Sequence, residues 1–215
     1  MDTPPAHPPR RGRKPSALRD RILEVTLDEL ERTGQPDAVT IAAVVAAAGC
    51  TPPSLYHYWA SREQLVRDAS GLGWARFAAA QGLAAAQSAD PLERIRLRGA
   101  AYVAFAQHRP ALFRILFLGP RAAEPNTLPA SASASAHLGP SFLELEDDVA
   151  AAVTAGTIEA AGASARELAM VLWCAVHGLA TLSLSAPGDA DQLLEETQVV
   201  IQRLILRPPH PAPRT

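Results

Sequence analysis

Three features of the sequence predict an all-α fold. Alanine, which has the strongest helix propensity, is abundant, whereas aromatic residues, which favour strands, make up only 5% of the chain. Hydrophobic residues occupy 48% of the 215 positions, enough for a sizeable core. Apolar residues recur every three or four positions along most of the chain, and no segment alternates with the period of a strand. We therefore expect an N-terminal three-helix domain and a C-terminal helical bundle, with about nine helices in total.

The two ends of the chain lack this periodicity. Residues 1–15 combine proline with basic residues, which predicts a disordered basic arm. Residues 208–215 are rich in proline and are expected to form a flexible tail. We assign residues 16–60 to the first helical domain and residues 61–207 to the second.

The first two helices have recognisable start and stop signals. An amphipathic helix is expected from about Ser16 to Gly34, since apolar residues recur every fourth position and acidic residues occupy the opposite face. Thr40 is a suitable N-cap for a short second helix, because its hydroxyl can accept a bond from a backbone amide. Gly49 ends that helix, because glycine tolerates the left-handed conformation.

Two more helices follow directly. Thr51 is placed to cap a third helix, in which Pro52 occupies the first position and Tyr58 the last. A capping-box sequence, serine followed three residues later by glutamine, starts a fourth helix at about Arg62. This helix is expected to extend into the alanine-rich segment near Ala86.

Further helices are expected from the spacing of apolar residues at 92–106, 110–117, 142–153, 168–182 and 194–204. Acidic residues are scattered over their polar faces. Residues 119–140 interrupt the pattern with four prolines and an alternating serine-alanine run. A structureless segment of this length is usually disordered or functional.

The charge distribution and the cysteine content limit the classes of function and the cell compartment that we expect for this protein. The formal net charge is −2, but residues 10–21 hold six basic residues and one acidic residue, so any charge that attracts nucleic acid is local. Cys50 and Cys174 are far apart in the sequence, which is typical of a reduced, cytoplasmic protein.

Nucleotide-binding, zinc-peptidase and Cys-x-x-Cys motifs are absent, so we expect no enzymatic activity, no cofactor and no metal site. Residues 168–188 are uncharged but interrupted by polar residues, which favours a buried helix over a membrane span.

The second and third helices, joined by a glycine-containing turn, have the form of a helix-turn-helix motif. In such motifs the start of the second helix faces base edges in the major groove, here at Thr51, Pro52, Pro53 and Ser54. The residues expected to contact phosphates are Tyr56, His57, Arg62 and, through its backbone amide, Thr40. A plain three-helix bundle has the same local pattern, so the motif alone leaves both interpretations open.

Residues 40–65 resemble the DNA-binding signature of the tetracycline-repressor (TetR) family. The shared features are a threonine-capped helix ending in Ala-Gly, a Leu-Tyr-x-x-aromatic helix and a Ser-Arg-Glu-x-Leu start of the next helix. The resemblance extends from Leu18 to Val66 and implies a bacterial transcription regulator. It places Leu55 and Trp59 in the core, with tryptophan where phenylalanine is more usual. It also implies DNA contacts at Thr40, Thr51, Pro53, Tyr56, His57 and Arg62.

The basic arm resembles an extension that some family members lay along the minor groove. Its candidate contacts are Arg11, Arg13 and Lys14, because narrow minor grooves attract arginine and lysine. A solvated tail that only aids solubility is the alternative.

The segment from Trp173 to Gly178 resembles a Trp-His-Gly motif that names one C-terminal subclass of the family. Trp173 and His177 are four residues apart and share a helix face. Cys174 lies beside His177, but two ligands do not make a metal site. The alternative is that these side chains only form a core. The full predicted effector site is Tyr102, Phe105, Phe113, Leu116, Trp173 and His177.

The resemblance implies a ligand-responsive, sequence-specific regulator, most often a repressor. Such a protein binds a palindromic operator in double-stranded DNA as a homodimer formed through its last two helices. A small apolar or amphipathic effector would release it from DNA. Two alternatives stay open, a DNA-binding regulator without a small-molecule ligand and a helical-bundle enzyme.

Overall fold

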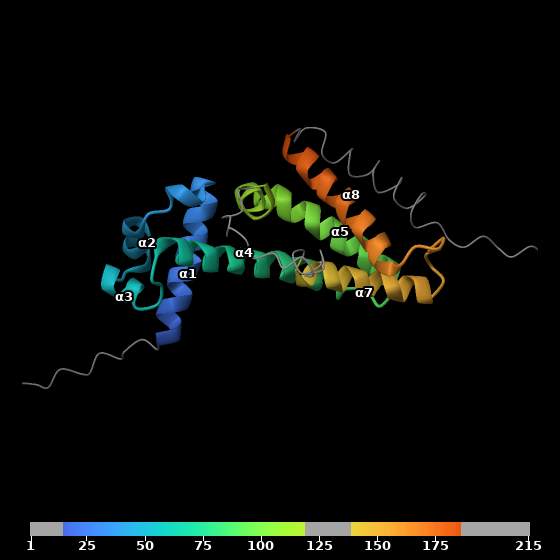
Figure 1. Ribbon diagram of the computed structural model, residues 1–215, viewed down its shortest axis with the longest axis horizontal. Coiled ribbons are helices and arrows are strands. Elements are labelled where there is room, and N and C mark those ends of the chain that lie inside the picture. The colour runs from blue at the N-terminus through green and yellow to red at the C-terminus, as the bar shows by residue number, and fades with distance from the viewer. Residues whose placement is uncertain (1–14, 119–138, 186–215) are drawn as a thin grey trace, which may run out of the picture. The chain divides into compact units, whose positions relative to one another are not determined.

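The computed structural model describes residues 15–118 and 139–185, and every regular element in those two ranges is helical (Figure 1). The all-α prediction is therefore confirmed. The chain divides into two compact units, residues 1–72 and 73–215, which we call the N-terminal unit and the C-terminal unit. The expected basic arm, the expected ninth helix at 194–204 and the tail lie outside the described residues.

The N-terminal unit contains α1 (Pro15–Thr33), the 3-10 turn η1 (Pro36–Ala38), α2 (Ile41–Ala48), α3 (Pro52–Tyr56) and the first turns of α4 (Arg62–Ala85). Helix α1 buries one apolar face, which includes Ile22, Leu27 and Leu30. On the same face the hydroxyl of Thr26 donates to the carbonyl oxygen of Ile22 at 2.7 Å, so this buried polar group is satisfied.

The division between the units falls inside α4, beyond the boundary that we expect after residue 60. The reason is that the first turns of α4 belong to the N-terminal core. Leu65 is fully buried there, and the Asp68 carboxylate accepts a hydrogen bond of 2.9 Å from the Trp59 indole. Trp59 itself is buried, with the guanidinium of Arg19 lying 5.5 Å from the centre of its ring.

Local signals set the ends of α2 and α4 as predicted. The hydroxyl of Thr40 accepts a hydrogen bond from the Ala43 amide at 3.2 Å, and Gly49 ends α2 with φ at +63°. The Ser61 hydroxyl accepts from the Gln64 amide at 3.2 Å. In return, the Gln64 side chain accepts from the backbone amide of Ala60 at 3.0 Å.

Helix α3 is shorter than predicted, because it ends at Tyr56 rather than Tyr58. The carbonyl oxygen of Leu55 accepts from the amides of both Tyr58 and Trp59, and this tight turn brings Trp59 into the core. Thr51 occupies the N-cap position, but its hydroxyl makes no bond to a backbone amide. It lies 3.0 Å from the Ser54 hydroxyl instead.

The C-terminal unit contains the rest of α4, α5 (Pro91–His108), α6 (Pro110–Phe113), the π-helical turn η2 (Arg114–Leu118), α7 (Pro140–Thr154) and α8 (Ala165–Ser185). Helices α5, α7 and α8 pack against one another (Figure 1). The helix predicted at 110–117 is wrong in one respect, because α6 ends after one turn and continues as η2. π-Helical turns are rare, and this one carries Phe117, whose ring lies against those of Phe113 and His177.

A buried ion network joins α5 to α7. Arg98 and Asp148 are only 4% and 3% exposed, and Nε of Arg98 donates to Asp148 at 2.6 Å. Arg94 reaches the other oxygen of Asp148 at 2.7 Å, and Arg98 also donates to Glu144 at 2.6 Å. The expectation that acidic residues lie on polar faces is therefore wrong for Asp148. Its charge is tolerated because two guanidinium groups surround it.

Helix α8 is long and apolar enough to cross a membrane by length and composition alone. It packs against α5 and α7 instead, and buries Leu172, Trp173 and Leu179.

Candidate functional sites

Helix α3 presents the predicted base-reading residues on a buried anchor. Leu55 is fully buried, whereas Thr51, Pro52 and Pro53 are exposed at the start of the helix. Ser54 is half-buried and shares a hydrogen bond with Thr51. The structure thus brings these four side chains together on one turn, with apolar rings and hydroxyls next to one another.

The predicted phosphate-binding residues on α3 are also exposed. Half of the Tyr56 side chain is accessible, and His57 is exposed beside it. A large aromatic side chain with this exposure contributes little to the core. Its hydroxyl is free to reach a partner outside the unit, such as a phosphate oxygen.

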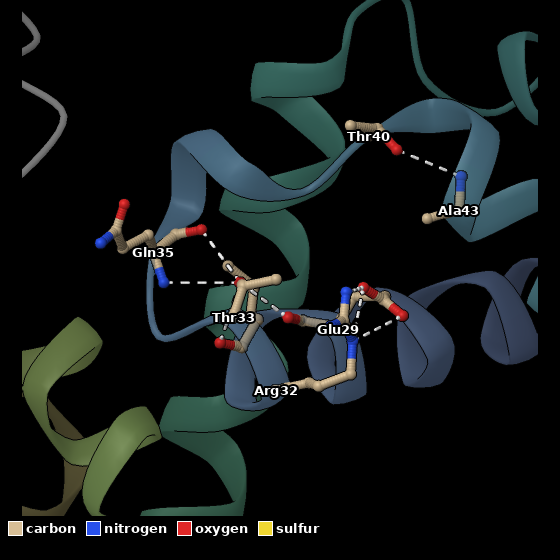
Figure 2. Close-up of polar contacts among 7 residues, drawn as sticks. Glu29, Arg32, Thr33, Gln35, Thr40 and Ala43 are labelled. Atoms are coloured by element: carbon tan, nitrogen blue, oxygen red, sulfur yellow. Dashed lines mark hydrogen bonds and ion pairs between the residues drawn. The ribbon is translucent and has the colours of Figure 1, made fainter.

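Thr40 lies exposed at the N-terminus of α2, where Figure 2 shows its hydroxyl pointing to the Ala43 amide. The turn before it is shaped by Thr33, whose hydroxyl donates to the Glu29 carbonyl at 2.8 Å and lies 3.1 Å from the Gln35 carbonyl (Figure 2). Nearby, the hydrogen bond from Arg32 lowers the pKa of Glu29. The Thr40 hydroxyl thus occupies the Ala43 amide in the first turn of α2.

Arg62 is placed differently from the other candidates. Its Nη1 atom donates to the carbonyl oxygens of Pro36 at 2.7 Å and Val39 at 3.3 Å. Its Nη2 atom lies 3.4 Å from Asp37, and Nε lies 3.2 Å from Glu63. The guanidinium, which the sequence assigns to a phosphate, is thus occupied within the protein. It braces η1 and, through it, the backbone that leads to Thr40.

The N-terminal unit holds two further sets of candidates from the sequence, the basic arm and Cys50. Arg11, Arg13 and Lys14 lie outside the described residues. Burial raises the pKa of the half-buried Cys50 thiol, against a smaller opposing effect of the Arg21 charge. The uncharged thiol is the less reactive form, which fits an apolar filler.

The C-terminal unit gathers the predicted effector residues. Tyr102 lies 5.3 Å from Trp173 and 5.9 Å from Phe113, measured between ring centres. The ring of Phe113 stacks on that of His177, with 5.8 Å between their centres. The ring of Phe105 contacts that of Phe77, with 5.2 Å between their centres, and Phe77 in turn contacts Tyr102. All of these rings are buried except that of His177, which is half-buried. Leu116 is buried on η2.

The effector site predicted from the sequence does not include the two rings at the centre of this arrangement. Phe77 comes from α4 and Phe117 from η2, and their ring centres are 5.1 Å apart. Phe117 also meets the rings of Trp74, Tyr102, Phe113, Trp173 and His177. The available signal for Phe77 is a large aromatic residue within an alanine-rich helix. We call this set the aromatic cluster: Trp74, Phe77, Tyr102, Phe105, Phe113, Phe117, Trp173 and His177.

One polar contact lies inside the aromatic cluster. The Tyr102 hydroxyl lies 2.8 Å from Nδ1 of His177, although the two residues are 75 positions apart. Burial raises the pKa of Tyr102 and lowers the pKa of His177. Both shifts favour the uncharged forms, so the pair is neutral at neutral pH.

Among the described residues, no group of three His, Cys, Asp or Glu side chains is placed to hold a metal ion. Cys174 is exposed on α8.

Two family descriptions match this chain. Residues 22–69 match the bacterial regulatory proteins of the tetR family, and residues 95–204 match the tetracyclin repressor-like C-terminal domain. Among curated protein sequences, no relative matches the chain.

Solved structures share the fold at low sequence identity. A Rhodococcus sp. RHA1 protein of unknown function superposes with a TM-score of 0.72 at 22% identity, covering 88% of this chain and 96% of its own. A structure described as the molecular basis for control of antibiotic production by bacterial hormones has a TM-score of 0.68 at 20% identity, with 89% and 98% covered. The Bacillus subtilis transcriptional regulator FadR in complex with stearoyl-CoA has a TM-score of 0.64 at 14% identity, with 89% and 99% covered.

Proposed function

The chain belongs to the TetR family of bacterial regulatory proteins and is a DNA-binding transcription regulator, and we propose that it is a ligand-responsive repressor. In this proposal, a homodimer binds a palindromic operator through α3 and leaves it when a small apolar or amphipathic effector occupies the aromatic cluster. The observation that carries the proposal is the Tyr102–His177 hydrogen bond among packed aromatic rings. A purely structural core has less need of a buried titratable pair.

Operator binding is supported by the way that α3 exposes its start. Thr51, Pro52, Pro53 and Ser54 provide the base-edge contacts, with the proline rings suited to thymine methyl groups. Tyr56, His57 and the backbone amide at Thr40 hold phosphates and so fix the register. Arg11, Arg13 and Lys14 add contacts in the minor groove.

Effector binding is supported by the composition of the aromatic cluster. Small-molecule sites are mostly apolar, with a few placed polar groups that orient the ligand. Tyr102, Phe105, Phe113, Leu116 and Trp173 supply the apolar surface, and His177 supplies the polar group. The Bacillus subtilis neighbour is described in complex with stearoyl-CoA, which shows that a related fold takes an acyl ligand.

Dimerisation is supported by the outer face of α8. Val171 and Leu182 are large apolar residues that remain exposed in the single chain, and Cys174 is exposed between them. Such an apolar stripe suits a two-fold contact with the α8 of a second copy and with the helix expected at 194–204. Two recognition helices would then face half-sites about one DNA turn apart. We place this protein in the cytoplasm, where its DNA target lies.

A regulator without a small-molecule ligand is the second candidate. The close packing of the aromatic rings favours this candidate, because a structural core that binds no ligand is packed in the same way. The two candidates differ in what the C-terminal unit does to DNA affinity, because coupling requires that effector and DNA each weaken the other's binding by the same factor.

The test is fluorescence anisotropy of the purified full chain with duplex DNA from upstream of its own gene, against a scrambled duplex. Preferential, salt-sensitive binding by a dimer supports the DNA half of the proposal. Release of that duplex by an apolar compound, lost in His177→Ala, supports the effector half. Sequence-specific binding that no compound changes favours the ligand-free regulator, and equal binding to both duplexes contradicts operator recognition at this site.

A further inference from the structure

The Tyr102–His177 contact fixes the direction of its hydrogen bond. Within the described part of the chain, the Tyr102 hydroxyl has no other hydrogen-bond partner, so its proton is satisfied only if it donates to Nδ1 of His177. A neutral histidine that accepts at Nδ1 carries its proton at Nε2. His177 therefore offers a donor at its outer nitrogen.

A second donor lies one turn from the same rings. Gln81 is only 3% exposed, and its Nε2 atom has no hydrogen-bond partner among the described residues. It follows Phe77 by four positions on α4, so both side chains lie on the same helix face. A buried amide group without a partner is rare in folded proteins and calls for an explanation such as an absent ligand.

The neighbouring charges place Gln81 more closely. Helices α4 and α5 are consecutive, and Phe77 of α4 meets Tyr102 of α5 at 4.9 Å. On α4, Gln81 lies four residues after Phe77 and directly before Gly82. A Cβ added to Gly82 would lie 3.9 Å from Glu144, the partner of Arg98. Along α4, Gln81 therefore lies between a residue of the aromatic cluster and a residue that approaches the ion network.

That network carries no surplus charge for a ligand. The two guanidinium groups of Arg94 and Arg98 are matched by the carboxylates of Asp148 and Glu144. Since His177 is also neutral, an ionic ligand group would be buried without a free counter-charge, which is costly.

We propose that the effector is a neutral, largely apolar molecule with two acceptor oxygens, such as carbonyl, ester or lactone oxygens, one bound by Nε2–H of His177 and the other by the Gln81 amide. This inference rests on the proposed function and adds Gln81 as a residue that determines effector specificity. A ligand of this class accepts a hydrogen bond from each of these two donors, and its apolar body replaces contacts within the aromatic cluster.

The first test uses four naphthalenes of similar size and the full chain, with binding followed by tryptophan fluorescence. The probes are 2,6-diacetylnaphthalene, 2-acetylnaphthalene, 2-ethylnaphthalene and 2-(aminomethyl)naphthalene. We expect the diacetyl compound to bind about tenfold more tightly than the monoacetyl compound, the ethyl compound to bind more weakly again, and the cationic amine to bind weakest.

Variants show which residue causes each difference in affinity between the probes. Gln81→Leu should remove the advantage of the second acetyl group, while His177→Phe should remove that of the first. Gln107→Leu, at an exposed glutamine on α5, is the matched control and should leave the series unchanged. Probes that bind with equal affinity whatever their acceptors would overturn the inference while leaving an effector site in place. Failure of every probe to bind would contradict the effector half of the proposed function as well.

The second test needs no ligand. Long-range proton–nitrogen NMR of the full chain reports the histidine tautomer, with His177→Gln used for assignment. We expect the Nε2–H tautomer in the free protein and a mixture in Tyr102→Phe. A dominant Nδ1–H tautomer in the unaltered protein would overturn the donor assignment.

Discussion

The two units of this protein build their functional surfaces in opposite ways. In the N-terminal unit, the candidate residues from Thr51 to His57 lie on the short helix α3 and its two caps, and all are exposed except Ser54, which is half-buried; Leu55 is buried beneath them. In the C-terminal unit, Phe77, Tyr102, Phe117 and His177 come from four separate elements and pack against one another. The first surface depends on local caps, and the second on the whole bundle. Substitutions should therefore affect binding alone in the first unit, and binding together with stability in the second.

The largest expected effect is on the ion network of the C-terminal unit. Asp148→Ala removes the buried carboxylate that neutralises Arg94 and Arg98, and leaves the buried Arg98 with only the partly exposed Glu144 as a partner among the described residues. We expect the free energy of unfolding to fall by about 3–5 kcal/mol, measured by urea denaturation. Asp147→Ala, at an exposed neighbouring position, is the control and should change it by under about 0.5 kcal/mol. Similar losses for both variants would show that the network is not a special source of stability.

The next prediction distinguishes two roles of Arg62, which either holds η1 in place or contacts a DNA phosphate. Arg62→Ala frees the carbonyl oxygens of Pro36 and Val39 and loosens the backbone before Thr40. We expect operator affinity to fall about tenfold, whereas the slope of log affinity against log salt stays the same. Arg67→Ala, at an exposed position on the same helix, controls for the loss of one charge. If the slope for Arg62→Ala instead decreases by about one, Arg62 contacts a phosphate directly.

A smaller effect is expected at Tyr56, because its hydroxyl is offered to a single phosphate. Tyr56→Phe should weaken binding to every duplex by about threefold to tenfold, without changing the melting temperature of the protein. Thr51→Ala should instead change which base is preferred, as random-site selection would report. The reverse pattern would mean that α3 is oriented differently in the groove.

The smallest effect is a pH dependence that only the C-terminal unit should show. Burial lowers the pKa of His177 below its value in the unfolded chain, so the unfolded state binds the proton more readily. Stability is therefore complete above about pH 6.5 and is lost as the pH falls toward the folded-state value. The fall between about pH 7 and 5.5 should shrink in His177→Gln. It should persist in His108→Gln, at an exposed histidine, and an unchanged fall in both variants would exclude His177 as its source.

Much of the N-terminal unit was predictable because its determinants act within four residues. The Thr40 cap, the positive φ of Gly49 and the capping box at Ser61 set helix ends through short-range bonds. The end of α3 was not predictable in this way, because it depends on the insertion of Trp59 into the core. The bonds from Arg62 to the carbonyl oxygens of Pro36 and Val39 were not predictable for the same reason, since these residues are more than 20 positions away in the sequence.

The sequence by itself determined the all-α fold class, the helix-turn-helix and most helix ends, since periodicity and capping are properties of neighbouring residues. Only the tertiary structure decided that Tyr102 meets His177, that Arg98 meets Asp148, and that Phe77 and Phe117 occupy the centre of the aromatic cluster. These pairs are separated by 75, 50 and 40 positions, respectively. Which of several apolar faces meets which is set by the packing of all the helices together, and no local pattern carries that information.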